Sequence, residues 1–319
     1  FLVAIGTSAS AFWILALNSW MQTPQGFEVI DGQLHATSWM AVIFNPSFPY
    51  RFAHMMIASG LTAAFLVAGI SALQLLRERK FEPATRMLRL GVVVAAVLTP
   101  LQIMVGDLHG LNTLKHQPAK IAAIEAIWET ERGAPLLLFA MPNQERRSND
   151  YAISLPKGAS LILTHTLDGE LKGLSEFGDK HPPVAPVFWT FRVMVGVGLL
   201  MLAASWLGAL LLIRHREFPR WLLWTYSGMT FSGWIAVLAG WLTTEIGRQP
   251  YVVYGVIMTA DTASTVPAAY IATTFIGYAL VYSLLLISYM VVLTQLARRQ
   301  AEGKGRDLPA PGALGPQVP

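Results

Sequence analysis

His54 is the only histidine predicted to lie inside an apolar run long enough to cross a membrane, RFAHMMIASG. A neutral imidazole is the common axial ligand of heme iron, but a histidine in this position can equally form a hydrogen bond to a neighbouring helix. With one such histidine, this chain cannot by itself hold two hemes through two pairs of histidines. Heme iron at His54 would need a second ligand from another chain or of another type, for which methionine is the usual choice.

Arg192 and Met194 lie at a similar depth in another apolar run, PVFWTFRVMVGVG. Met194 either fills space between helices, as methionine often does, or supplies the thioether of that second ligand. A guanidinium inside a membrane span is expected to face an anion or a wet cavity, and a heme propionate would be such an anion. The two residues are about 200° apart around a helix, so they need not face the same atom.

Trp241, Glu245 and Arg248 are spaced i, i+4 and i+7 in GWLTTEIGRQPY, which places them on one helical face before Pro250 ends the helix. One interpretation is an ion pair at the membrane interface with an aromatic anchor. The other places the Glu245 carboxylate on a metal or a proton path, with Arg248 on an acidic group.

Lys120 and Glu125 belong to HQPAKIAAIEAIWET, which predicts a short helix with a stripe of mixed apolar and acidic positions. Such a helix either lies on the membrane surface or contributes polar contacts to an amphipathic substrate. Asp107, in VGDLHG, is either a surface charge at a helix end or a proton acceptor.

The composition predicts a membrane protein. Of 319 residues, 54% are hydrophobic and only 13% are charged, and the mean hydropathy is +0.47. These values exclude an average soluble enzyme, a disordered chain and a nucleic-acid-binding protein. The absence of cysteine excludes disulfides and thiolate chemistry.

The elements expected to position these side chains are membrane helices in an all-α, polytopic transmembrane bundle. Six spans are predicted, at residues 1–17, 52–76, 88–106, 187–213, 221–244 and 269–296. Three spans therefore lie in a region 1–106 and three in a region 187–296. Because the chain opens inside an apolar run, we expect it to be part of a longer protein.

The charged connections predict the orientation. The short stretches 77–89, 214–220 and 298–306 hold twelve of the 23 Lys and Arg residues, which places them in the cytoplasm. The long connection 107–186 is then on the outer side. The Gly- and Pro-rich segment 297–319 is predicted to be a disordered cytoplasmic tail.

Five motifs together resemble subunit I of the cytochrome bd family of quinol oxidases. In chain order they are NSWMQTPQGF, RFAHMMIASG, KIAAIEAIWET, PVFWTFRVMVG and GRQPY. Their order and spacing follow the family from residue 1 to about 296. The long connection is similar to the short Q loop branch of the family, which includes cyanide-insensitive oxidases.

The resemblance implies a role for each candidate residue. His54 and Met194 would be the axial ligands of a low-spin heme b, and Arg192 would stabilise the charge of that heme. By the same resemblance, Glu245 would be on or beside a high-spin heme b, with Trp241 between cofactors and Arg248 near propionates. Lys120 and Glu125 would form the quinol-site pair, and Asp107 would be an acidic residue near them.

The implied function is a quinol:dioxygen oxidoreductase in the bacterial inner membrane. It would oxidise ubiquinol or menaquinol at the outer-side loop and reduce dioxygen to water, generating proton motive force without pumping. A third heme, heme d or a second-type heme in its place, would complete the oxygen site, with ligands on the further helices that the resemblance implies upstream of Phe1. The implied partners are subunit II and a small single-helix protein, with no nucleic acid.

Two alternatives stay open from the residues alone. One is a non-catalytic membrane subunit that carries heme b for electron transfer. The other is a transporter that uses Glu245 and Arg248 as a coupling pair, although the lack of an internal repeat weakens it.

Overall fold

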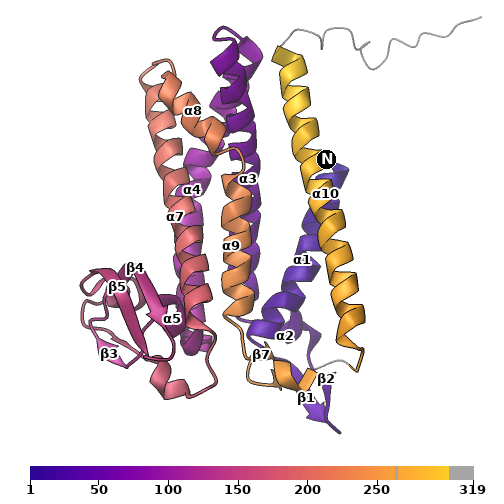
Figure 1. Ribbon diagram of the computed structural model, residues 1–319, viewed down its shortest axis with the longest axis vertical. Coiled ribbons are helices and arrows are strands. Elements are labelled where there is room, and N and C mark those ends of the chain that lie inside the picture. Colours follow the sequence, from indigo (N-terminus) through magenta and orange to yellow (C-terminus); the bar gives the residue numbers. More distant parts are fainter. Residues whose placement is uncertain (263–264, 302–319) are drawn as a thin grey trace, which may run out of the picture.

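The computed structural model describes residues 1–262 and 265–301 and shows a bundle of long helices whose axes are roughly parallel (Figure 1). Five helices in this described part are long and apolar enough to cross a membrane, which confirms the predicted polytopic helix bundle. They are α1 (Leu2–Gln22), α3 (Phe48–Arg77), α4 (Glu82–His116), α7 (Val184–Ile213) and α10 (Ala268–Ala301).

The predicted span 221–244 is wrong as a single helix. It consists of two shorter helices, α8 (Arg220–Gly228) and α9 (Ser232–Ile246), so the structure has one fewer full-length span than predicted. At the break, the hydroxyls of Thr230 and Ser232 donate hydrogen bonds to the carbonyls of Ser227 and Met229. Side-chain hydroxyls of this kind let a membrane helix break without leaving its carbonyls unpaired.

Two helices extend further than the sequence predicts. α4 continues ten residues beyond the predicted end at residue 106, so Asp107 and His109 lie within a helix and the long connection begins at Gln117. The prediction that His54 is the only histidine in a span is therefore wrong. α10 continues to Ala301, so residues 297–301 of the predicted tail are helical, and residues 302–319 lie outside the described residues.

The connections carry four small antiparallel sheets that an all-α description leaves out. These are β1 (Phe27–Ile30) with β2 (Gln33–Ala36), β3 (Glu131–Arg132) with β6 (Glu170–Leu171), β4 (Leu136–Asn143) with β5 (Ser148–Leu155), and β7 (Tyr251–Val253) with β8 (Ile257–Met258). Short helices accompany them: α2 (Trp39–Ile43), α5 (Pro118–Glu125), α6 (Gly158–Thr164), and the 3-10 turns η1 (Leu174–Phe177) and η2 (Thr259–Thr262).

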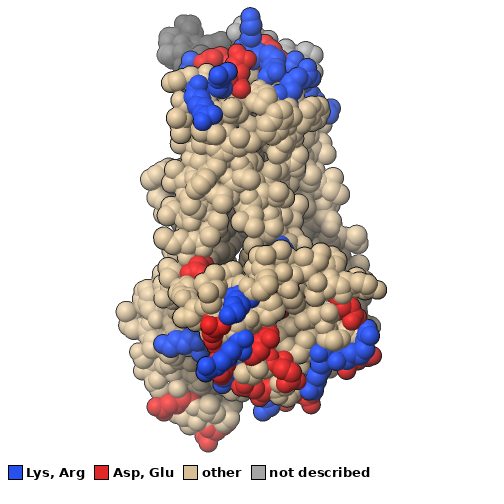
Figure 2. Space-filling view, turned by 90° about the vertical axis from the view of Figure 1, so that its left-hand side faces the viewer, with Lys and Arg blue, Asp and Glu red and all other residues tan. Residues whose placement is uncertain are grey.

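The two ends of the bundle differ in what they carry. We call the end with α5 and the small sheets the loop end, and the end with the α3–α4 and α7–α8 turns the basic end (Figure 1). Figure 2 shows a long uncharged middle between them, Lys and Arg gathered at the basic end, and both signs of charge mixed at the loop end. This distribution agrees with the charge asymmetry in the sequence.

Two apolar cores hold the bundle together. One lies toward the basic end between α3, α4, α7 and α8, around Phe65, Leu88 and Tyr226. The second lies at the loop end, where α5 and β4 pack on the first turns of α7 around Ile124 and Phe188. The second core fixes the long connection against the bundle and so positions the candidate site.

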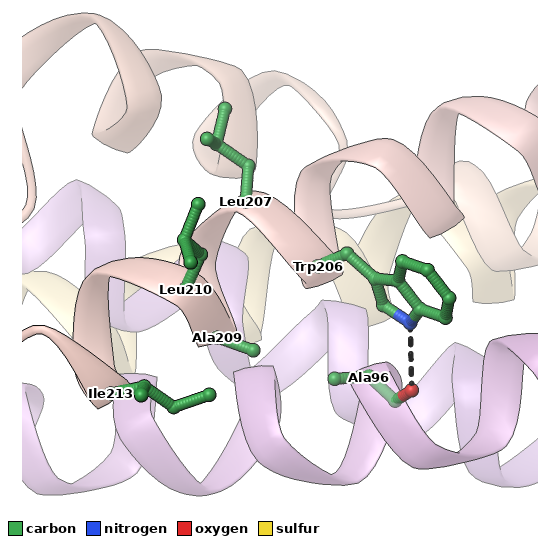
Figure 3. A pocket seen from close by; sticks show the side chains of 6 residues that line it. All are labelled: Ala96, Trp206, Leu207, Ala209, Leu210 and Ile213. Atoms are coloured by element: carbon green, nitrogen blue, oxygen red, sulfur yellow. Dashed lines mark hydrogen bonds between the residues drawn. The ribbon is translucent and has the colours of Figure 1, made fainter.

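Pro100 lies inside α4 and has no N–H, so the carbonyl of Ala96, one turn before it, loses its helical partner. The indole Nε1 of Trp206 on α7 donates a hydrogen bond to that carbonyl at 3.1 Å (Figure 3). An unpaired carbonyl is costly in hydrocarbon, so this contact both satisfies α4 and joins it to α7.

We predict that Trp206→Phe lowers the free energy of unfolding by about 0.6–2 kcal/mol, the range measured for hydrogen bonds between membrane helices. In a Pro100→Ala background the same change should cost less, because replacing the proline restores a backbone N–H for the Ala96 carbonyl. Unfolding of the purified protein in mixed micelles measures both values. An equal cost in the two backgrounds would show that the contact does not compensate for Pro100.

Candidate cofactor site

Three cationic side chains are buried together at the loop end. Arg51 lies on α3, Lys120 on α5 and Arg248 in the turn after α9, and 8%, 4% and 8% of their surfaces are exposed. One carboxylate, Glu245, lies among them, with its Oε2 2.6 Å from Arg248 Nη2. We call these four residues the cationic cluster; it carries an excess of two positive charges when Lys120 is protonated.

Asn18 at the end of α1 joins Arg51 to Glu245 and, through Glu245, to Arg248. Its Oδ1 accepts a hydrogen bond from Arg51 Nη1 at 2.5 Å, and its Nδ2 donates to Glu245 Oε1 at 2.8 Å. A single amide therefore links an arginine on α3 to a carboxylate on α9. The network fixes the positions of α1, α3 and α9 relative to one another at the loop end.

Lys120, in the long connection, is held separately, by Gln22 one turn after Asn18 on α1. Its Nζ donates to Gln22 Oε1 at 2.5 Å, and Gln117 Nε2 donates to the carbonyl oxygen of Gln22 at 2.9 Å. Burial lowers the pKa of Lys120 well below its usual range, and the nearby Arg51 lowers it further. A bound anion at this point would favour the protonated amine.

The cluster fits an anionic group. Among the described residues, Arg248 Nε and Nη1 are buried and have no hydrogen-bond partner. Buried guanidinium nitrogens without partners are costly, and acidic oxygens on the two sides of the guanidinium would satisfy them. Three buried cations against one carboxylate are therefore suited to the acidic side chains of a cofactor such as a heme.

His54 lies on α3 one turn beyond Arg51, toward the middle of the bundle. Its Nε2 is 3.0 Å from Gln102 Nε2 of α4, and its ring is 5.9 Å from the ring of His109, centroid to centroid. Of the residues that the structure describes, Gln102 is another with a buried unpaired atom, Oε1. An imidazole held by one neutral amide can exchange that partner for a metal ion.

Met194 lies at the same depth as His54. Gly233 of α9 lies against Thr62 of α3, because a Cβ added to the glycine would meet that threonine. The two helices run in opposite directions (Figure 1). From that contact toward the loop end, Gly240 on α9 and His54 on α3 each lie about 10–12 Å along their helices, so these two residues are at the same depth. A Cβ on Gly240 would lie only 2.7 Å from Met194 Sδ. The thioether thus faces α9, whereas His54 is held by α4.

Arg192 is placed differently from its predicted role as a partner of the heme. Its Nη2 lies 2.8 Å from Glu125 Oε2, and the rest of its guanidinium donates to carbonyls of the long connection. Glu125 is thereby paired with Arg192, while Lys120 reaches Gln22. The predicted quinol-site pair is buried on one helix, but its two members contact different partners.

Trp241 and Asp107 lie apart from these networks. Trp241 is 58% exposed on the surface of α9. Glu245 and Arg248 therefore contact each other as their shared helical face predicts, but the Trp241 indole does not join them. Asp107 Oδ2 lies 3.8 Å from His165 Nε2 of the long connection, and both side chains are partly exposed. Asp107 is therefore paired at the surface of α4 and has no direct contact with Lys120 or Glu125 in the described structure.

Several residues of the site were not predicted from the sequence. Arg51, Asn18 and Gln22 stand in the motifs RFAHMMIASG and NSWMQTPQGF without a predicted role of their own. The available signal was the spacing of Asn18 and Gln22, which lie i, i+4 on one face of α1. His109 was missed because α4 was predicted to end before it.

The fold and the site define a polytopic membrane protein with a buried cationic site that fits an anionic cofactor. The profile of the family cytochrome bd terminal oxidase subunit I matches residues 1–301, and the chain belongs to this family. Cytochrome bd ubiquinol oxidase subunit 1 of Bacillus subtilis is 32% identical over 299 residues. Cytochrome bd-II ubiquinol oxidase subunit 1 of Escherichia coli is 28% identical over 367 residues.

The solved structure of the bd oxidase from Geobacillus thermodenitrificans has the same fold, with a TM-score of 0.83 and 33% sequence identity. The match covers 93% of this chain and 68% of that one. The two relatives above are matched over 89% and 93% of this chain, but over 64% and 71% of their own lengths. The chain therefore spans about two thirds of its relatives. The resemblance stated from the motifs is confirmed.

We predict that Asn18→Leu destabilises the protein, because it removes hydrogen bonds to two charged groups, each worth about 1.5–3 kcal/mol. Thermal unfolding of the purified protein should show a clear decrease in midpoint. The exposed Gln33→Leu in β2 is the matched control for adding an apolar side chain. A midpoint for Asn18→Leu equal to that of the control would mean that the network does not hold the three helices.

Proposed function

We propose that this chain is the heme-bearing subunit of a quinol:dioxygen oxidoreductase that oxidises ubiquinol or menaquinol at the loop end and reduces dioxygen to water. The observation that carries the proposal is the cationic cluster, with its unpaired Arg248 nitrogens, beside His54 and Glu245. Relatives named as ubiquinol and menaquinol oxidase subunits support the same chemistry.

The cofactors proposed are a low-spin heme b, a high-spin heme b, and a heme d or second-type heme; when bound, they supply one-electron transfer and the reduction of dioxygen. His54 and Met194 would hold the low-spin iron, and Glu245 would hold the high-spin iron. The equal depth of His54 and Met194 supports the first assignment. Trp241, on the surface of α9, would lie between cofactors.

Arg248 and Arg51 would bind acidic groups of these cofactors. Arg248 has two buried nitrogens available for them, and Arg51 adds positive charge on the facing helix. Both guanidiniums are placed before a cofactor binds, because Glu245 and Asn18 hold them. Such preorganisation lowers the cost of ordering these side chains when the anion arrives.

Glu125 is proposed to accept a proton from quinol. Burial raises the pKa of this carboxyl, and Arg192, through its charge and its hydrogen bond, opposes the rise. A carboxyl under these two opposed influences can gain and release a proton at a fixed position. Lys120, held at Gln22 on another side of α5, would contact the quinol or a cofactor acid, and Asp107 would relay protons at the surface of α4.

The proposed orientation places the loop end on the outer side of the bacterial inner membrane and the C-terminal tail in the cytoplasm. Protons released from quinol outside and taken up for water formation from inside would separate charge without pumping. Subunit II and a small single-helix protein are the proposed partners. The surface of α10 supports a partner, because its most apolar window is entirely exposed within this chain.

The family match favours the oxidase over a subunit that only carries electrons through heme b. A reduced-minus-oxidised spectrum of the purified complex separates the two. Heme d absorption in the red supports the oxidase, whereas heme b absorption alone would support the carrier. A spectrum with neither would contradict both and leave the transporter interpretation.

We predict that His54→Ala abolishes the low-spin heme b signal and quinol oxidation, because no imidazole remains on α3 at that depth. The exposed His35→Ala in β2 is the control and should leave both unchanged. Pyridine hemochrome content and the reduced spectrum of each purified variant provide the measurement. An unaltered low-spin band in His54→Ala would remove this ligand assignment.

We predict that Glu125→Gln keeps the hemes in place but reduces quinol turnover by about 10²–10⁴-fold, the usual contribution of a positioned proton acceptor. Glu145→Gln, at an exposed position in the same connection, is the matched control. Turnover is followed as quinol-dependent oxygen uptake at equal heme content. Normal turnover with intact hemes would place proton acceptance elsewhere.

A further inference from the structure

Arg192 joins α7 to two separate elements of the long connection. Its Nε and Nη2 donate to the carbonyl oxygen of Leu137 in β4 at 3.1 and 2.9 Å. Its Nη1 donates to the carbonyl oxygen of Ile124, and its Nη2 also donates to Glu125 Oε2 at 2.8 Å. All three guanidinium nitrogens are thus engaged with the long connection.

The two carbonyls lie where regular secondary structure ends or is interrupted. Ile124 lies in the last turn of α5, where carbonyls have no partner within the helix. Leu137 lies next to a register shift in the β4–β5 pairing. Arg192 therefore supplies donors to a carbonyl that the helix leaves without a partner and to one at the edge of an irregular stretch of the sheet.

The surroundings of Arg192 show that these contacts fix its position. The ring of Phe188, one turn earlier on α7, lies 3.8 Å from the guanidinium carbon. The side chains of Arg192 and Glu125 are 12% and 6% exposed, so little water competes with their ion pair. Removing one member of such a buried pair leaves the other charge uncompensated.

We propose that Arg192 is a positioning residue that pins α5 and β4 to α7 and thereby fixes Glu125 beside the helix that carries Met194. Arg192 precedes Met194 by two residues, about 3 Å along the helix axis. The Arg192 side chain then sets the position of the proposed proton acceptor, Glu125, relative to the thioether of Met194. The inference rests on the proposed function only in treating Glu125 as that acceptor.

The test compares hydrogen–deuterium exchange of residues 118–143 in the purified complex. Arg192→Gln is expected to speed exchange of these amides by about tenfold or more, given the cost of breaking a buried ion pair. Arg146→Gln is the matched control, since its ion pair with Asp150 is exposed and belongs to the same connection; exchange should stay at the wild-type rate.

A double variant distinguishes pinning from a general packing role. Glu125→Gln in the Arg192→Gln background removes the uncompensated carboxylate, so exchange should be slower than in Arg192→Gln alone. A double variant that exchanges as fast as or faster than Arg192→Gln would overturn the proposal. Wild-type exchange in Arg192→Gln with an altered low-spin heme spectrum would also overturn it, because Arg192 would then act on the heme.

These outcomes are independent of turnover. A wild-type complex without hemes or quinol oxidation would contradict the proposed function, while the exchange of residues 118–143 would still report whether Arg192 holds them.

Discussion

The burial of more positive than negative charge at the loop end is the constraint on which the rest of this structure depends. Arg51, Lys120 and Arg248 are almost fully enclosed, with Glu245 as their one carboxylate. Such an arrangement is unfavourable unless neutral hydrogen-bonding groups and an external anion compensate it. The amides of Asn18 and Gln22 supply the first, and the family's heme cofactors carry acids that can supply the second.

The same constraint explains why elements distant in the chain meet at this end. α1, α3, α5 and the end of α9 meet through hydrogen bonds of two α1 residues: Asn18 binds Arg51 and Glu245, and Gln22 binds Lys120. The second ion pair, between Arg192 and Glu125, ties the long connection to α7. The middle of the bundle contains fewer specific contacts, such as the indole of Trp206 that compensates for Pro100. Chemistry is therefore concentrated where the helices leave the apolar layer.

Much of the architecture could be predicted because hydropathy reports burial in lipid directly. Five of the six spans follow from it. The break after Gly228 was missed because apolar residues on both sides of TYSGMTFSG dominate a hydropathy average, although the small and hydroxyl-bearing residues of this run form the break. The extension of α4 to His116 was missed for the opposite reason, since polar residues continue the helix where it meets the long connection.

Partner choice was the least predictable part of the site. Arg192 was expected to face a cofactor acid, but a carboxylate 67 positions away in the chain pairs with it. Only the folded chain brings Glu125 there. Similarly, nothing in the sequence around Arg51 indicates that residues of α1 and α9 lie beside it.

The most direct test of the central claim is a density map of the purified complex at the cationic cluster. The account predicts a porphyrin acid group within hydrogen-bond distance of Arg248 Nε or Nη1. A map in which these nitrogens contact only protein or water, with no anionic group near Arg51 or Lys120, would contradict it.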